Sequence, residues 1–140
     1  MKKHFLTKLD LSDSKTDILP PLSYLDDQKV TNDQDTVILA SYPRSGNTLL
    51  RAYLEKIMGL CTGSDCDIEK KLNKELMYMG LNGEGLVDKR VWIVKTHYPE
   101  RYGKTKFYAE RCILCIRNPL DCITSLFNMV CTGSHNKSIQ

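Results

Sequence analysis

The sequence predicts an open parallel α/β sheet with flanking helices. Three short apolar runs, 37–40, 91–94 and 112–116, read as buried strands, and each is followed directly by polar residues. Helical patterns follow the first and third runs within a few residues. Since ligands bind at the carboxyl ends of the strands in such sheets, the polar residues after the three runs form the candidate site.

The length and the net charge of the chain limit the classes of function that it can have. A chain of 140 residues fits one domain, and a net charge of +3 from 20 basic and 17 acidic residues is too small to indicate nucleic-acid binding by bulk electrostatics. No apolar run approaches the roughly 20 residues of a membrane-spanning helix, and the first six residues lack the apolar stretch of a signal peptide. These features favour a cytoplasmic protein.

The polar beginning of the chain differs from the rest. Residues 1–35 are rich in Asp, Ser, Lys and Gln, include Pro20 and Pro21, and have no sustained hydrophobic period. We therefore expect an N-terminal arm over 1–35 and one folded unit over 36–140.

The loop after the first run, residues 41–48, has the composition of a phosphate-binding turn. Gly46 allows a sharp turn directly before a helix whose N-terminal N–H groups attract anions. Arg44 adds a charge, and the side chains of Ser45, Asn47 and Thr48 add donors. A Walker A loop of a kinase would have Gly five positions before Gly46 and Lys directly after it, which this chain lacks. An ordinary strand-to-helix turn is the other interpretation.

Two helices are expected next. The first has its apolar residues on one face and ends at Gly59; these residues are Leu49, Leu50, Tyr53, Leu54, Ile57 and Met58. The second is expected from about Asp67, as N-cap, to Met79, with Ile68, Leu72, Leu76 and Met79 facing inward.

The second run leads into Lys95, Thr96 and His97. Alternation along an extended chain sends Lys95 and His97 to one side and Thr96 to the other. A neutral imidazole takes a proton from an alcohol near pH 7, and an ammonium group stabilises charge on a departing oxygen. Taken alone, such a pair is more often solvated surface.

The third run leads into Arg117, then into a helix with Asn118 as cap and Pro119 in its first position. The apolar residues Leu120, Ile123, Phe127 and Val130 continue this helix. Arg117 and Ser125 are placed to meet a second phosphate, although a helix cap and a small core-facing residue would look the same.

The six cysteines show no convincing metal or redox pattern. Cys112 and Cys115 have C-x-x-C spacing but lie in an apolar strand, where residues three apart face opposite sides. Cys122 lies in the first turns of a helix. We interpret them as small buried hydrophobic residues.

Together these motifs resemble those of a known family. The heptapeptide Tyr-Pro-Arg-Ser-Gly-Asn-Thr at 42–48 is similar to the 5′-phosphosulfate loop of sulfotransferases that use 3′-phosphoadenosine 5′-phosphosulfate (PAPS). The stretch from Arg117 to Ser125 resembles their 3′-phosphate motif, and Lys95 to His97 resembles the strand that carries the catalytic base in the cytosolic branch. The three motifs occur in family order within residues 36–132.

The resemblance implies a P-loop-like sulfotransferase fold and transfer of a sulfuryl group from PAPS to an acceptor hydroxyl, without a metal. His97 is the implied base, and Lys95 and Arg44 the implied stabilisers of charge. The implied nucleotide ligands are Arg44, Ser45, Gly46, Asn47, Thr48, Arg117 and Ser125. A carboxylate such as Asp67 is a minor rival for the base, and a P-loop kinase or a non-catalytic nucleotide-binding relative remains open.

Within the family, the Arg-Ser-Gly-Asn-Thr loop followed by Thr62, Gly63 and Ser64 most resembles the WSC-domain, sialate O-sulfotransferase-like branch. Members of that branch are anchored in membranes, so the resemblance leaves a Golgi location open. Family members also continue well beyond the 3′-phosphate helix, whereas this chain ends at Gln140. We therefore expect a C-terminally truncated chain with an incomplete site.

Overall fold

In the computed structural model, the described residues are 21–25, 36–98 and 105–139. The predicted arm over 1–35 lies outside the described residues except for 21–25. Within that short segment, Ser23 forms an isolated parallel bridge with Leu60.

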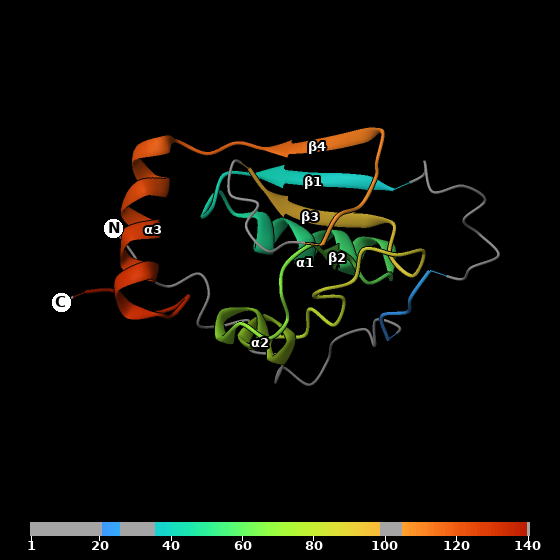
Figure 1. Cartoon of the computed structure of the whole chain (residues 1–140), viewed down its shortest axis with the longest axis horizontal. Helices are drawn as coiled ribbons and strands as arrows, with labels where there is room; N and C mark the ends of the chain where they lie inside the picture. The colour runs from blue at the N-terminus through green and yellow to red at the C-terminus, as the bar shows by residue number, and fades with distance from the viewer. Residues whose placement is uncertain (1–20, 26–35, 99–104, 140) are drawn as a thin grey trace.

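The centre of the fold is a sheet of four parallel strands, which confirms the predicted α/β class. They are β1 (Val37–Ser41), β2 (Gly63–Ser64), β3 (Ile93–His97) and β4 (Arg111–Cys115), in the order β2-β3-β1-β4. The arrowheads of β1, β3 and β4 all point toward the end of the molecule where helix α3 (Pro119–Thr132) lies (Figure 1). The carboxyl edge of the sheet is therefore the edge nearest α3.

Helix α1 (Asn47–Met58) covers one face of the sheet. Leu50, Leu54 and Met58 pack against a buried core cluster made by Val37, Leu39 and Ile93. The helix ends at Gly59 with φ 67°, the left-handed cap expected there. The predicted apolar face is too wide, however, because Leu49, Tyr53 and Ile57 are exposed.

Helix α2 (Lys71–Tyr78) begins later than the sequence predicts. Asp67 does not cap it; its carboxylate accepts a hydrogen bond from the main-chain N–H of Glu69, which makes a local turn instead. Leu76 is buried as expected, whereas Ile68 and Met79 are exposed. The prediction mistook the Asp67 turn for the first turn of the helix.

The second strand is shifted relative to the prediction, because β3 includes the polar residues Lys95, Thr96 and His97. Trp92, expected inside this strand, lies before it and is partly exposed. The two-residue strand β2 was not predicted, since a Gly-Ser pair has neither a hydrophobic period nor strand propensity.

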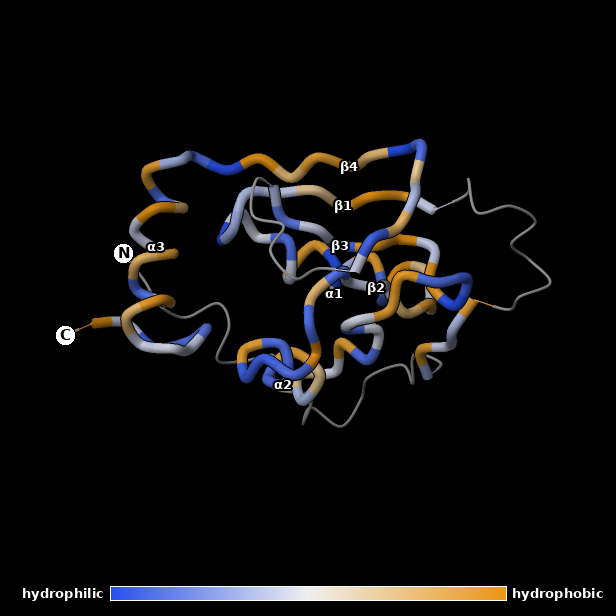
Figure 2. Tube along the Cα trace, in the orientation of Figure 1, coloured by the Kyte–Doolittle hydropathy of each residue, from blue (hydrophilic) through white to orange (hydrophobic). Residues whose placement is uncertain are grey.

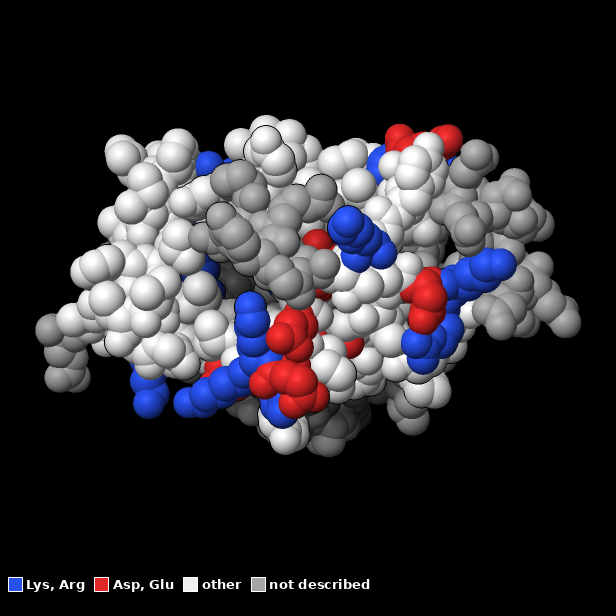
Figure 3. Space-filling view, viewed as in Figure 1, with Lys and Arg blue, Asp and Glu red and all other residues white. Residues whose placement is uncertain are grey.

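Strand β4 contradicts the expectation of burial, and the apolar residues of helix α3 are exposed as well. Cys112, Ile113 and Leu114 are exposed, and β4 lies at the edge of the sheet. Helix α3 begins as predicted, with Asn118 accepting a hydrogen bond from the N–H of Leu120 and Pro119 in its first position. Its apolar residues are nevertheless exposed: Leu120, Ile123, Phe127 and Val130. Figures 2 and 3 show this region as hydrophobic along the chain and largely uncharged on the face in view.

Cysteine burial is mixed. Cys61 and Cys122 are buried, as the interpretation as small hydrophobic residues requires, but Cys112 and Cys131 are exposed. None of the helices in the described residues combines the length and apolar character that a membrane span requires.

Candidate functional site

The strand register brings the three sequence motifs to one edge. Ser41, the last residue of β1, pairs with His97 of β3 on one side and with Cys115 of β4 on the other. The loop after β1, the polar end of β3 and the segment that joins β4 to α3 therefore start side by side. This is the arrangement that the parallel sheet predicts for a ligand site.

The loop between β1 and α1 turns through two left-handed residues. Gly46 has φ 102° and precedes the first residue of α1, and Arg44 has φ 68°. Among the described residues, Arg44 is the one non-glycine with positive φ. A side chain at Gly46 would meet nothing within 4 Å, so its backbone conformation, and not lack of space, favours glycine there. A left-handed arginine is uncommon enough to suggest a functional position.

The Arg44 side chain donates hydrogen bonds to residues of α3 and of the segment that follows α3. Its Nε donates to the Ser125 hydroxyl at 2.9 Å, and its Nη2 donates to the carbonyl oxygen of His135 at 3.2 Å. Its Nη1 lies 3.1 Å from the imidazole Nδ1 of His135. Burial, and next the charge of Arg117, lower the pKa of Arg44. Ser125 and Arg44 therefore meet, although they belong to two separate sequence motifs.

His135 is fixed by bonds at both ring nitrogens. Because a guanidinium can only donate, Nδ1 accepts from Arg44, and Nε2 carries the proton, which it donates to the Leu72 carbonyl 3.3 Å away. Burial, and next the charge of Arg44, lower the pKa of His135. The neutral imidazole thus joins α2, α3 and the loop.

Arg117 lies at the same edge but contacts a main-chain atom of the loop. Its Nη1 donates to the carbonyl oxygen of Arg44 at 3.1 Å, and its side chain is exposed. A cavity of about 290 Å³ opens beside it. Its lining comes from the ends of β1 and β4 and the loop: Ala40, Ser41, Tyr42, Ser45, Tyr98, Leu114, Cys115, Ile116 and Arg117. Two aromatic rings, two serines and an arginine suit a ligand with a flat ring and an anionic group.

His97 contacts Ser41 through one ring nitrogen. Its Nδ1 lies 3.0 Å from the Ser41 hydroxyl and 3.2 Å from the Ser41 carbonyl oxygen. The Ser41 hydroxyl also accepts from Nδ2 of Asn47 at 2.9 Å. The second proton of the Asn47 amide goes to the Leu39 carbonyl at 3.1 Å, so both side-chain donors of Asn47 are used inside the protein.

Lys95 and Thr96 bond to two consecutive residues of the segment after β2. Lys95 is buried, and its ammonium group donates to the Cys66 thiol at 3.5 Å. The Thr96 hydroxyl donates to the carboxylate of the fully buried Asp65 at 2.6 Å. The segment that contains Asp65 and Cys66 therefore holds the side chains of Lys95 and Thr96.

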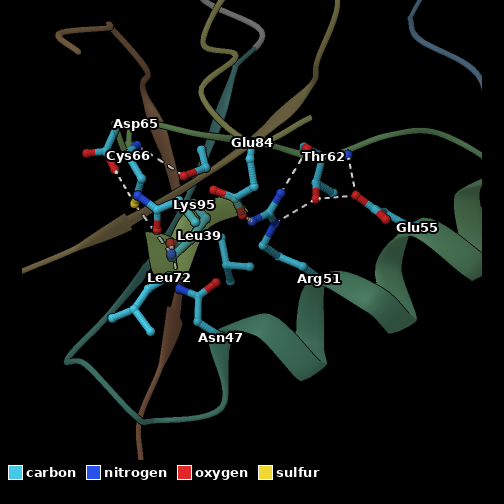
Figure 4. A network of polar contacts seen from close by, with 12 residues as sticks. Leu39, Asn47, Arg51, Glu55, Thr62, Asp65, Cys66, Leu72, Glu84 and Lys95 are labelled. Carbon is cyan, nitrogen blue, oxygen red and sulfur yellow. Dashed lines mark hydrogen bonds and ion pairs between the residues drawn. The ribbon is translucent and has the colours of Figure 1, made fainter. Parts of the chain in front are cut away.

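A buried charge network anchors that segment to α1 (Figure 4). Arg51, fully buried, forms an ion pair with Glu84 and donates to the hydroxyl and carbonyl of Thr62 at 2.8 and 3.0 Å. Thr62 in turn donates its main-chain N–H and its hydroxyl to the Glu55 carboxylate, at 2.8 and 2.7 Å. These bonds fix Thr62 three residues before Asp65, and thereby fix the segment that holds Lys95.

Sequence reasoning brought the main motifs together but missed three of their partners. The role of Ser41 follows from the strand register, which a correct β3 alignment would have predicted. Cys66 and His135 have no sequence signal, because their contacts depend on how α2 and α3 pack. Across residues 21–25, 36–98 and 105–139, no three His, Cys, Asp or Glu side chains gather into a group that can hold a metal ion.

Comparison with known proteins gives a consistent result. Residues 34–138 match the family described as the sulfotransferase domain. A WSCD family member of Drosophila pseudoobscura is 39% identical over 97 residues, which cover 69% of this chain and 28% of that protein. A WSCD family member of Aedes aegypti is 35% identical over 113 residues, which cover 77% of this chain and 32% of that protein. The chain thus spans about a third of the length of these relatives, and no solved structure matches it.

Proposed function

Because this chain belongs to the sulfotransferase domain family, we propose that residues 36–140 form the nucleotide-binding part of an enzyme that transfers a sulfuryl group from PAPS to an acceptor hydroxyl. The observation that carries the proposal is the register at the carboxyl edge. Ser41 lies between His97 and Cys115, so the loop, the base and the 3′-phosphate motif start from adjacent strands.

The residues of the edge suit a nucleotide that carries two phosphate groups. The main-chain amides of Gly46, Asn47 and Thr48 at the start of α1, with the hydroxyl groups of Ser45 and Thr48, are proposed to hold the 5′-phosphosulfate. Arg117 and Ser125 are proposed to hold the 3′-phosphate. The cavity beside Arg117, with Tyr42 and Tyr98 in its lining, supports this assignment because aromatic rings stack on a purine.

The proposed chemistry needs one proton acceptor and two cations. PAPS supplies an activated sulfuryl group: the acceptor oxygen forms a bond to sulfur, the bond from sulfur to the bridging oxygen breaks, and adenosine 3′,5′-bisphosphate leaves. His97 takes the proton of the acceptor hydroxyl. Lys95 and Arg44 stabilise the negative charge. Since Arg44 now donates to Ser125 and His135, it must exchange these bonds to reach a ligand.

Calorimetry with adenosine 3′,5′-bisphosphate tests the site. We expect binding by the wild-type chain and affinity about tenfold or more lower in Arg44→Ala and in Arg117→Ala, since a charge-assisted contact contributes about 1.5–3 kcal/mol. Arg90→Ala is the matched control, because it removes the same charge from a loop where Arg90 donates to Asp88. No binding, or binding indifferent to both changes, would contradict the proposal.

Two further measurements separate the alternatives. Tighter binding of ATP with magnesium than of the bisphosphate would favour a P-loop kinase. Release of the bisphosphate from PAPS in the presence of a hydroxyl acceptor reports transfer, and His97→Gln should lower kcat by about 10²–10⁴. Binding without any turnover would favour a non-catalytic nucleotide-binding relative.

A further inference from the structure

The Arg44 guanidinium makes most of its hydrogen bonds inside the protein. A guanidinium has five N–H groups, and four acceptors among the described residues contact that of Arg44. Ser125 and Met129 each supply one acceptor, and His135 supplies two: its imidazole Nδ1 at 3.1 Å and its carbonyl oxygen at 3.2 Å. A bidentate contact with a phosphate needs two N–H groups. Arg44 therefore has too few free donors for such a contact while these bonds persist.

The four acceptors of Arg44 are all uncharged. They are a hydroxyl, a thioether sulfur, a neutral imidazole nitrogen and a carbonyl oxygen. The neighbouring charge that acts on the guanidinium is the positive charge of Arg117. Because hydrogen bonds between two charged groups are stronger than those to neutral acceptors, a phosphate oxygen is a better partner for Arg44 than any of the four. The present contacts can therefore be exchanged for contacts with a nucleotide.

His135 is held in place by bonds that do not involve Arg44. Its Nε2–H donates to the Leu72 carbonyl of α2 at 3.3 Å. The segment that contains it folds back on α3, where the Asn128 side-chain oxygen accepts from the main-chain N–H of Ile139 at 3.3 Å. His135 therefore presents both of its acceptors to Arg44 from a fixed position between α2 and α3.

The partners of Arg44 differ in what they gain from a nucleotide. Ser125 is itself a proposed ligand, so its hydroxyl gains a phosphate when Arg44 turns away. His135 is not a proposed ligand, and its half-buried Nδ1 would lose the donor that it now has. An acceptor left without a donor costs free energy. Every binding event that uses Arg44 therefore includes the loss of its bonds with His135.

We propose that His135 regulates nucleotide binding by competing with the phosphate groups for Arg44. The two contacts that Nδ1 and the carbonyl oxygen of His135 make with Arg44 are called the His135 contacts below. They hold the guanidinium against α3, so the nucleotide binds more weakly than the charged groups of the site alone would allow. This inference rests on the proposed function, because it needs Arg44 as a ligand of the nucleotide.

Calorimetry with adenosine 3′,5′-bisphosphate tests the competition with a matched pair of variants. His135→Leu and His135→Asn introduce side chains of similar size, but only Asn keeps an acceptor near the place of Nδ1. We expect His135→Leu to bind the bisphosphate about three- to tenfold more tightly than the wild type, the equilibrium equivalent of one hydrogen bond. His135→Asn should stay within about twofold of the wild type. If His135 only stabilised the site, its loss would weaken binding instead.

A double-mutant cycle shows whether the effect acts through Arg44. In an Arg44→Ala background, His135→Leu should leave the remaining affinity unchanged, because no guanidinium is left to compete for. Thr132→Ala is a control at the end of α3: its hydroxyl donates to the carbonyl oxygens of Asn128 and Ser134, not to the loop. This change should leave the affinity within about twofold, and circular dichroism checks that each variant is folded.

The imidazole of His135 gives a direct readout in the wild-type chain. Long-range ¹H–¹⁵N spectra of ¹⁵N-histidine protein at pH 8, assigned with His135→Asn, report whether its unprotonated Nδ1 accepts a hydrogen bond. Addition of the bisphosphate should move the Nδ1 signal toward that of an unbonded nitrogen. The shift should follow the same dependence on concentration as binding by calorimetry.

Three results would overturn the inference: an affinity of His135→Leu equal to or below that of the wild type, an equal gain in the Arg44→Ala background, or binding that leaves the Nδ1 signal of His135 unchanged. Failure of the proposed function looks different. In that case neither the wild type nor His135→Leu binds the bisphosphate, and the regulatory role of His135 is refuted together with the function.

Discussion

The buried charge network around Arg51 gives the sharpest prediction on stability. We consider Arg51→Met, which keeps most of the side-chain volume but removes the guanidinium. In the wild-type chain Arg51 is paired with Glu84 and donates twice to Thr62, and the Arg51 and Glu84 side chains are both fully buried. After the change, Glu84 keeps a carboxylate in the interior without its cation, and Thr62 loses both donors.

The expected loss is about 3–5 kcal/mol, because removal of one partner leaves an uncompensated buried charge. At roughly 3 °C per kcal/mol for a domain of this size, the melting temperature should fall by about 10–15 °C. The double variant Arg51→Met with Glu84→Met should be more stable than Arg51→Met alone by about 1 kcal/mol or more, since it removes the isolated carboxylate as well.

Urea unfolding, followed by the fluorescence of the single tryptophan Trp92 and by circular dichroism, measures these differences. Lys74→Met is the control, because the Lys74–Glu69 ion pair is exposed and its loss should leave the unfolding midpoint unchanged. The reasoning is refuted if Arg51→Met changes the free energy of unfolding by no more than the control does. It is equally refuted if the double variant is less stable than Arg51→Met.

Two further predictions concern the dependence of stability on pH and the cost of adding a side chain at two glycines. Because the pKa of His135 is lowered in the folded chain, the unfolded chain binds its proton first, so His135 makes the protein lose stability as pH falls below about 6.5. Urea midpoints from pH 7.5 to 5 should show this slope, and His135→Asn should reduce it; an unchanged slope would contradict the assignment. Gly63→Ala should destabilise by more than about 2 kcal/mol, since the new Cβ meets the Leu86 carbonyl oxygen at 2.2 Å. Gly59→Ala, which meets nothing within 4 Å but has φ 67°, should lose only about 1 kcal/mol, and equal losses would refute the steric argument.

The sequence was sufficient to predict the sheet class and the edge where the motifs meet. The continuous apolar run of β1 and the turn residues Pro43 and Gly46 are signals of the local sequence. They were therefore enough to predict the strand and the turn that follows it. The bounds of β3 could not be predicted in this way. Lys95 is buried and donates to Cys66, and a hydrophobicity pattern does not predict a buried lysine inside a strand. Burial in the sheet and a nearby acceptor together override the preference of a lysine for water.

Exposure was the weakest part of the prediction. The apolar residues of β4 and α3 have the patterns of buried elements, and patterns report only that a residue is apolar, not that another element covers it. Strand order decides that β4 is an edge, and strand order is a long-range property. For the same reason the sequence did not predict the contacts of His135, because its partners Arg44 and Leu72 lie in distant parts of the chain.

The position of β1 between β3 and β4 has a consequence for the rate of folding. Both neighbours of β1 come later in the chain, and Ser41 pairs with His97 across 56 residues. All the strand pairings among the described residues are parallel, so none of these pairs is a hairpin, and loop closure must precede the contacts of β1 with β3 and β4. Such topologies fold slowly. During synthesis, β1 and the apolar face of α1 therefore lack their sheet partners until both later strands have left the ribosome. Binding by a chaperone during this interval would favour native pairing over aggregation.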